Sequence, residues 1–274
     1  MRKRKLFCQI SPLCFKISVK KEILLRNTKD LFKNYKIAKT ISKDELPVVI
    51  KSHRSVLVRN LYGVDIELQK NKVTNIILAC NKLNGLIIKP NEVFSFWNIV
   101  GDISKQDGYK DGLIINPNGI GKGLGGGLCQ MSNMIHLLVV HSPLLEIELH
   151  HHGLALFPDE RRNAPFGTGT SICYNNVDYR FKNTLDQNVQ LLLWVEDGEL
   201  LGELRCEKPL ENRYRLIEKN HHYKKRENRY YRISQVYKQT ISKDNNEVVK
   251  EELLVDNDAE VMYDYSLIPI DEIE

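Results

Sequence analysis

A run of glycines that leads straight into an apolar helical pattern constrains the fold of this chain more than any other feature. Six of its sixteen glycines fall within the nine residues 119–127. From about Cys129 to Val140 the residues follow the pattern of an apolar helix, which Ser142-Pro143 ends. Because glycine allows backbone conformations and close approaches that other residues resist, the run predicts a glycine-rich turn that delivers Cys129 to the first turn of a central helix.

The segments around this helix alternate between helical and strand patterns. Apolar residues recur at helical spacing over Val73–Leu83, so a helix is predicted there. Asp197-Gly198 between two apolar runs is a strong signal for a two-residue hairpin. Strands are predicted at 86–88, 108–115, 144–149, 177–181, 189–195, 200–205, 229–240 and 248–255, and strand or turn at 91–97. These patterns predict an α+β fold with a mixed helix and antiparallel sheet core and a β-rich C-terminal part.

Charge and polarity divide the chain into three predicted parts. Residues 1–60 form a basic helical and loop region, and the first 51 residues carry a net charge of +10. Residues 61–208 form the core domain, which ends where a very polar stretch begins. Residues 209–274 form a β-rich extension whose acidic tail, 251–274, carries −9. The basic helix either meets this acidic tail or contacts an anionic partner such as a membrane surface.

Several functional classes are disfavoured by the sequence. No apolar stretch approaches 18 residues, so no transmembrane helix is expected. The basic residues 1–5 are not followed by the apolar core of a signal peptide, so we expect a cytoplasmic protein, with the inner membrane face as an alternative location. A glycine-rich dinucleotide motif is inevitable in such a run, and no nucleic-acid partner is expected. The six cysteines form no CxxC pair, which is typical of reduced thiols.

Cys129 at the start of the central helix is the candidate nucleophile. Free N–H groups and the positive end of the helix dipole lower a thiol pKa, and the thiolate is the reactive form. His152 or His150 is the candidate general base, since the strand after the helix can return toward the helix start. Gln130 is the candidate oxyanion donor. Further candidates for substrate binding are Gly125, Gly126, Gly127, Ser132 and Trp97.

Two other interpretations of the same residues stay open. Cys129 is a buried structural thiol if the histidines only form a surface turn, and the chain is then a binding module without catalysis. Alternatively, Cys129, His150 and His152 ligate zinc and leave one position open for water. No other cofactor is expected.

The chain resembles the VanW family over most of its length. The blocks that carry the resemblance are 82–88, 90–97, 109–113, 125–133, 150–153, 164–167 and 178–183. The resemblance implies an association with vancomycin resistance and the cell wall, and it matches Cys129, Gln130 and Ser132 to the family's Cys-Gln-x-Ser. It also matches His150 and His152 to the family's paired histidines.

One departure from the family pattern concerns a carboxylate. The resemblance implies an Asp in a Gly-x-Asp-Ala-Thr segment, where this chain has Gly169. Asp159 and Asp178 are the candidates to replace it. The resulting hypothesis is a cell-wall accessory protein in which Cys129 supports acyl transfer or hydrolysis on peptidoglycan peptides or precursors.

Overall fold

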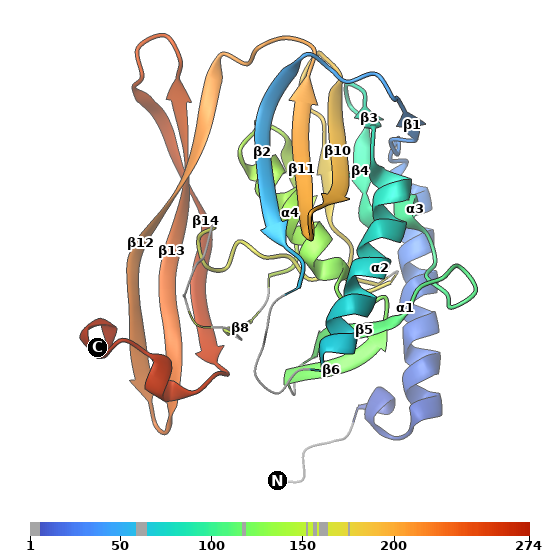
Figure 1. Cartoon of the computed structure of the whole chain (residues 1–274), viewed down its shortest axis with the longest axis vertical. Coiled ribbons are helices and arrows are strands. Elements are labelled where there is room, and N and C mark those ends of the chain that lie inside the picture. Colours follow the sequence, from blue (N-terminus) through green and yellow to red (C-terminus); the bar gives the residue numbers. More distant parts are fainter. Residues whose placement is uncertain are drawn as a thin grey trace.

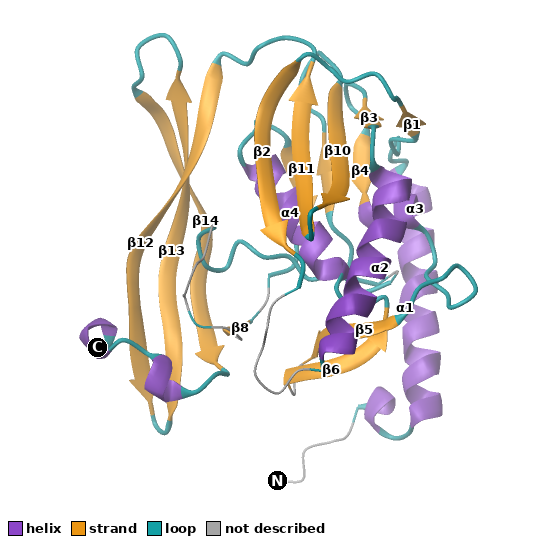
Figure 2. Ribbon diagram, in the orientation of Figure 1, coloured by secondary structure: helices purple, strands orange, loops and turns teal. Residues whose placement is uncertain are grey.

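A five-stranded antiparallel sheet forms the centre of the fold (Figure 1 and Figure 2). The computed structural model describes residues 6–58, 65–116, 119–151, 153–155, 158, 164–174 and 176–274. The strands of the sheet are, in spatial order, β1 (Thr40–Ile41), β3 (Leu86–Ile88), β10 (Val189–Glu196), β11 (Glu199–Cys206) and β2 (Val48–Val56). Asp197 and Gly198 join β10 to β11 at positive φ, so the predicted two-residue hairpin is confirmed.

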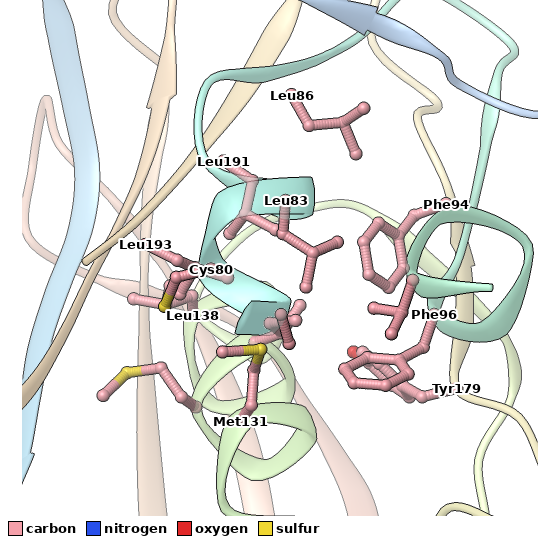
Figure 3. Packing of buried hydrophobic residues seen from close by; sticks show 14 of the residues in the cluster. Cys80, Leu83, Leu86, Phe94, Phe96, Met131, Leu138, Tyr179, Leu191 and Leu193 are labelled. Carbon is pink, nitrogen blue, oxygen red and sulfur yellow. The ribbon is translucent and has the colours of Figure 1, made fainter. Parts of the chain in front are cut away.

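Two helices supply most of the core against this sheet. Helix α2 (Ile66–Leu83) contacts β10, and α4 (Leu128–Val140) contacts β11 and β2. Figure 3 shows the buried side chains of α2, α4 and β10 gathered in one cluster. Aromatic rings continue this core, and the rings of Phe94 and Phe181 stack with centroids 4.8 Å apart. Burial of this continuous apolar surface is the main force that fixes α4, and thus Cys129, on the sheet.

Smaller elements surround this core. They are the helices α1 (Pro12–Lys33) and α3 (Phe96–Val100), a sheet of β4 (Val93–Ser95), β9 (Arg180–Lys182) and β7 (Leu145–Glu148), and the hairpin of β5 (Asp111–Asn116) and β6 (Gly119–Leu124). The C-terminal sheet has the order β12 (Asn212–Arg226), β13 (Arg229–Ser242), β14 (Val248–Val261) and β8 (Leu154–Ala155). Short 3₁₀ helices lie at Phe7–Gln9, Tyr265–Leu267 and Ile270–Glu272. None of the helices in the described ranges is long and apolar enough to cross a membrane.

The predicted α+β class is confirmed, and the C-terminal part is β-rich. The predicted central helix is α4, and the pair predicted at 229–240 and 248–255 is β13 with β14. At 91–97 the structure differs in part from the expected strand or turn. The strand ends at Ser95, whose hydroxyl caps the short helix α3.

Strands β1, β2 and β12 were not predicted. Residues 1–60 were expected to be helix and loop, but β1 and β2 form the two edges of the main sheet. The very polar stretch that follows residue 208 contains β12, an edge strand of the C-terminal sheet. Edge strands with one face in solvent carry charged residues there, which masks the apolar alternation. Ala155 of β8 also joins the small core of the C-terminal sheet.

The glycine run is only partly the turn that the sequence predicts. Residues up to Leu124 form strand β6, and only Gly125–Gly127 make the turn into α4. A Cβ placed on Gly126 would lie 2.2 Å from the carbonyl carbon of Gly112. The glycine therefore lets the turn lie against the backbone of β5, which aligns the start of α4.

We expect Gly126→Ala to destabilise the fold by about 1–3 kcal/mol, because the added methyl must displace backbone rather than a flexible side chain. Gly153→Ala is the matched control, since a Cβ there meets nothing within 4 Å. Urea unfolding of both variants measures the difference. Equal midpoints would show that the turn does not depend on this close approach.

Candidate functional site

The first two turns of α4 hold a neighbouring extended segment, residues 169–173. The Cys129 thiol lies 3.8 Å from the carbonyl oxygen of Ile172. Ser132 donates its hydroxyl to the carbonyl oxygen of Thr170 at 3.2 Å, and the Thr170 amide donates to Asn133 Oδ1 at 2.7 Å. The spacing of Cys129, Ser132 and Asn133 is that of one helical face, so all three meet the same segment.

His150 and His151 also bind segment 169–173. The Ser171 amide donates to the carbonyl oxygen of His150 at 2.6 Å, and His151 forms an isolated bridge with Thr170. His151 Nδ1 also lies 3.3 Å from the carbonyl oxygen of Gly169. Segment 169–173 thus joins the start of α4 to the histidines, in agreement with the expectation that the strand after α4 returns toward the helix start. Gly169, where the family pattern has Asp, lies within this junction.

The His150 side chain has a carboxylate partner that the sequence analysis missed. Its Nε2 lies 3.0 Å from Glu148 Oε1. Glu148 was not among the predicted site residues, although Glu148 and His150 lie two residues apart and project from one face of an extended segment. That period-2 relation is the signal that points to Glu148. An anionic Glu148 orients the imidazole through this contact.

Glu148 is held as a carboxylate by a network of positive charge. The Arg26 guanidinium pairs with both of its oxygens, and the amide of Asp178 donates to it at 3.0 Å. Burial alone would raise the pKa of Glu148, but the hydrogen bonds from Arg26 and His150 outweigh burial and hold this pKa at about 2. At neutral pH, Glu148 therefore presents a stable negative charge to His150.

The Cys129 thiol does not have the lowered pKa that its helical position predicts. Burial raises the pKa, and backbone hydrogen bonds at Ile172 and at Cys129 itself oppose this rise without cancelling it. The field at a helix start is thus outweighed by the cost of placing a thiolate among protein atoms. In this conformation the resting form of Cys129 is the neutral thiol.

Three other predicted site residues are engaged within the fold. The Gln130 amide nitrogen donates to Ser55 Oγ at 2.8 Å and to the carbonyl oxygen of Val56 at 2.9 Å. Both of its N–H donors are thus used to hold α4 against β2. Ser132 is fully buried, and Trp97 is 4% exposed with its indole N–H on the carbonyl oxygen of Val177. None of the three presents a free donor to a substrate in this conformation.

The glycines at 125–127 pack against the protein itself. A Cβ on Gly127 would lie 2.0 Å from Lys72 Cγ, and one on Gly125 would lie 2.4 Å from Ile103 Cδ1. Buried Asn75 of α2 donates to the carbonyl oxygen of Gly126 at 2.9 Å and also binds both backbone groups of Lys110. Asn75 thus fixes the turn. One weak signal could have pointed to Asn75, namely a polar residue on the buried side of an amphipathic helix.

Two predicted site residues, His152 and Asp159, lie outside the described ranges. The proposed zinc set includes His152, so its geometry is not described either. In the part of the chain that the structure describes, no group of three His, Cys, Asp or Glu side chains could hold a metal ion. The predicted set of Cys129, His150 and His152 stays a prediction. Asp178, the other candidate for the family carboxylate, is fully buried and accepts hydrogen bonds from Ser95, Trp97, Tyr179 and Arg180.

A cavity of about 270 Å³ lies away from these residues. It is lined by Lys51, His53, Leu137, His141, Pro165, Tyr214, Arg215 and Leu216. His141 lies twelve residues after Cys129, near the far end of α4, about 18 Å along the helix axis. The cavity is therefore distinct from the junction of Cys129 with the histidine segment.

Comparison with known proteins decides the family. The sequence model described as VanW like protein matches residues 71–205. The Vancomycin B-type resistance protein VanW of Enterococcus faecalis (strain ATCC 700802 / V583) is 30% identical over 226 residues, which are 82% of this chain and 82% of that protein. The chain belongs to the VanW family. Protein YoaR of Bacillus subtilis (strain 168) is 27% identical over 153 residues, 55% of this chain and 48% of that protein. No solved structure matches the chain.

The VanW match contains the whole junction. Cys129, His150, Glu148 and segment 169–173 all lie within residues 71–205. Arg26, which holds Glu148, lies outside the match but inside α1. The N-terminal helix therefore contributes to the electrostatics of the VanW region.

We expect Glu148→Gln to lower the stability of this VanW-family chain at pH 7 by about 1–3 kcal/mol, because Arg26 and His150 lose an anionic partner. A lowered folded-state pKa stabilises the protein above the ordinary carboxyl pKa of 4.5, and this contribution is lost as the pH falls toward about 2. The gap between wild type and variant should therefore shrink over that window. Chemical unfolding at several pH values measures it, with exposed Glu218→Gln as control; a gap independent of pH would contradict the network.

We expect Cys129 of the free protein to resist alkylation at pH 7.5, with a rate at least roughly tenfold below that of the urea-unfolded chain. Burial of the thiol and its raised pKa are the reasons. Peptide mass spectrometry after iodoacetamide pulses measures each cysteine separately, and exposed Cys173 is the internal comparison. Fast reaction at neutral pH that slows in His150→Ala would instead show a thiolate already formed in the free protein.

Proposed function

We propose that this protein is an accessory protein of vancomycin resistance that acts on peptidoglycan peptides or their precursors by cysteine-dependent acyl transfer or hydrolysis. The observation that carries the proposal is the junction at segment 169–173, which contacts the Cys129 thiol and also His150, two residues after Glu148 at the end of β7. The identity to a VanW resistance protein supports the biological setting.

The chemistry follows from the residues at this junction. Cys129 Sγ attacks a peptide or ester carbonyl carbon while its proton passes to His150, with His152 as the alternative base. The tetrahedral intermediate collapses, the C–N or C–O bond breaks, and the proton moves to the leaving amine or alcohol. Attack by water or a second amine on the thioester then releases the acyl group and restores the thiol. The backbone N–H of Cys129 is the proposed oxyanion donor, because the backbone N–H groups of Leu128 and Gln130 and the side-chain amide of Gln130 are bonded within the fold.

The resting thiol sets a requirement for this mechanism. Since burial raises the pKa of Cys129, the thiolate must form as the base takes the proton in the substrate complex. Glu148 supports that transfer because its negative charge stabilises the imidazolium that results. The proposed reaction therefore depends on the acid partner as well as on the base.

The proposed cytoplasmic location would limit the substrate to precursors, since cross-linked wall lies outside the membrane. All six cysteines are free, which supports a reducing compartment. Cell fractionation distinguishes this location from an exported one, for which mature wall peptides would be the substrates to assay.

We expect Cys129→Ser to lower acyl transfer or hydrolysis on precursor peptides by at least roughly a thousandfold, and His150→Ala by about a hundredfold or more. The assay is mass spectrometry of the peptide products, together with the resistance phenotype in cells. Cys173→Ser is the matched control, because it removes a nearby thiol outside the proposed chemistry.

Other outcomes would favour the alternatives. Full activity in Cys129→Ser would remove the nucleophile. Precursor binding without turnover, unchanged by Cys129→Ala, would favour a binding module. Stoichiometric zinc that is lost in a Cys129 variant would favour a metal-dependent hydrolase.

A further inference from the structure

Helix α1 carries its charged contacts on the side that faces the protein. Arg26 pairs with Glu148, and Asp30 accepts two hydrogen bonds from Arg180 at 2.7 and 2.6 Å. Arg26 and Asp30 lie four residues apart and so share one face of the helix. No residue of α1 is fully buried. Val19 and Ile23 lie on the same face but are only half-buried. Ion pairs are therefore the main attachment of this helix to the core.

Four strongly exposed apolar side chains of α1 lie on the outer side. Leu13, Ile17, Leu24 and Leu31 form a stripe, here called the outer stripe, and are 67%, 49%, 64% and 79% exposed. At 100° per residue, the four lie within about 40° of one another and roughly 135° from the ion-pair face. Figure 1 shows α1 along one side of the core.

The apolar surface continues beyond the helix start. Leu6, Phe7 and Ile10, before and around the short 3₁₀ helix, are each more than half exposed. Ordinary protein surfaces carry apolar residues singly and scattered. A continuous exposed apolar surface along one helix differs from this pattern and indicates an interaction site.

Basic residues accompany the outer stripe. Helix α1 carries six Lys or Arg and two acidic residues. Exposed Lys20 borders the stripe, about 20° from Leu13 around the helix, and exposed Lys16 lies about 60° from Leu13 on the same side. The four basic residues at positions 2–5 precede the apolar surface in the sequence. An apolar face bordered by lysines has the pattern of a helix that lies in a membrane interface.

We propose that the outer stripe of α1 binds the surface of an anionic phospholipid bilayer, with the helix axis parallel to the membrane plane. The leucines would enter the boundary between headgroups and acyl chains. Lys16 and Lys20 would extend to the lipid phosphates, because long basic side chains bury their stems and keep the charge at the polar surface.

Charge favours a bilayer over a second copy of this chain as the occupant. A symmetric contact of two outer stripes would bring Lys20 of each copy into an apolar interface beside a like charge. Burial of an ammonium group without a partner is costly. At a lipid surface the same lysine meets phosphate, so stripe and charge act together.

Vesicle flotation with the full-length chain tests the proposal. The probes are vesicles of phosphatidylglycerol and phosphatidylcholine in equal amounts, and vesicles of phosphatidylcholine alone. We expect binding to the anionic vesicles that weakens as salt rises. The double variant Leu24→Gln, Leu31→Gln should lose at least roughly tenfold in affinity, since it removes two side chains that enter the apolar layer. Lys16→Gln with Lys20→Gln should weaken binding to anionic vesicles only.

Matched control variants distinguish binding through the outer stripe from nonspecific binding by other exposed apolar side chains. Val249→Gln with Leu253→Gln removes two exposed apolar side chains from β14, and it should bind vesicles as wild type does. Unchanged melting temperatures would show that the α1 variants still fold. Cys129→Ser should also bind vesicles as wild type does, so membrane binding is tested independently of the proposed chemistry.

Three results would overturn the proposal. They are an absence of binding to anionic vesicles, equal binding by the Leu24→Gln, Leu31→Gln variant, and a dimer in sedimentation analysis that this variant dissociates while vesicles bind neither protein. The last result would assign the outer stripe to a second copy.

Discussion

The buried guanidinium of Arg180 is the interaction on which the rest of the site depends. Its side chain is 2% exposed, and it bonds Asp178 at 2.7 Å and both oxygens of Asp30. A buried cation without partners would be very costly, so these carboxylates must gather around it. Hydrogen bonds to Asp30 and Asp178 outweigh burial and keep the pKa of Arg180 above its ordinary value. The guanidinium therefore fixes α1, β9 and the start of α3 relative to one another.

This charge network reaches the candidate site through Glu148. Glu148 lies 3.6 Å from Arg180 Nε, pairs with Arg26, and also binds His150. The histidine is thus positioned by a carboxylate that is itself held by two cations. A carboxylate held in place in this way limits the orientation of the imidazole that it binds. The proton transfer proposed for His150 requires such positioning. It also means that α1 contributes to both the membrane surface and the site proposed above.

Local patterns predicted much of the fold, and long-range contacts account for what they missed. The hairpin at Asp197-Gly198 and the helix after the glycine run follow from turn chemistry and apolar periodicity, which lie within a few residues. Strand β2 was missed because its pairing with β11 spans about 150 residues and its outer face is polar. The position of Cys129 at a helix start was predicted from local pattern, but its raised pKa depends on burial within the folded chain, which local pattern does not show. Glu148 was missed because Arg26, which keeps it anionic, lies 122 residues away.

Residues 166–173 contact helix α4 on one side and the C-terminal sheet on the other. Thr170 is bound to α4, while the Phe166 carbonyl accepts from Asn257 of β14 at 2.9 Å, and the Phe166 ring lies 4.2 Å from the Arg232 guanidinium. Strand β8, just after the histidines, pairs with the end of β14. The C-terminal sheet therefore binds the chain at Phe166, four residues before Thr170. A substitution in β14, which lies outside the VanW match, would thus act close in the chain to the segment that contacts Cys129.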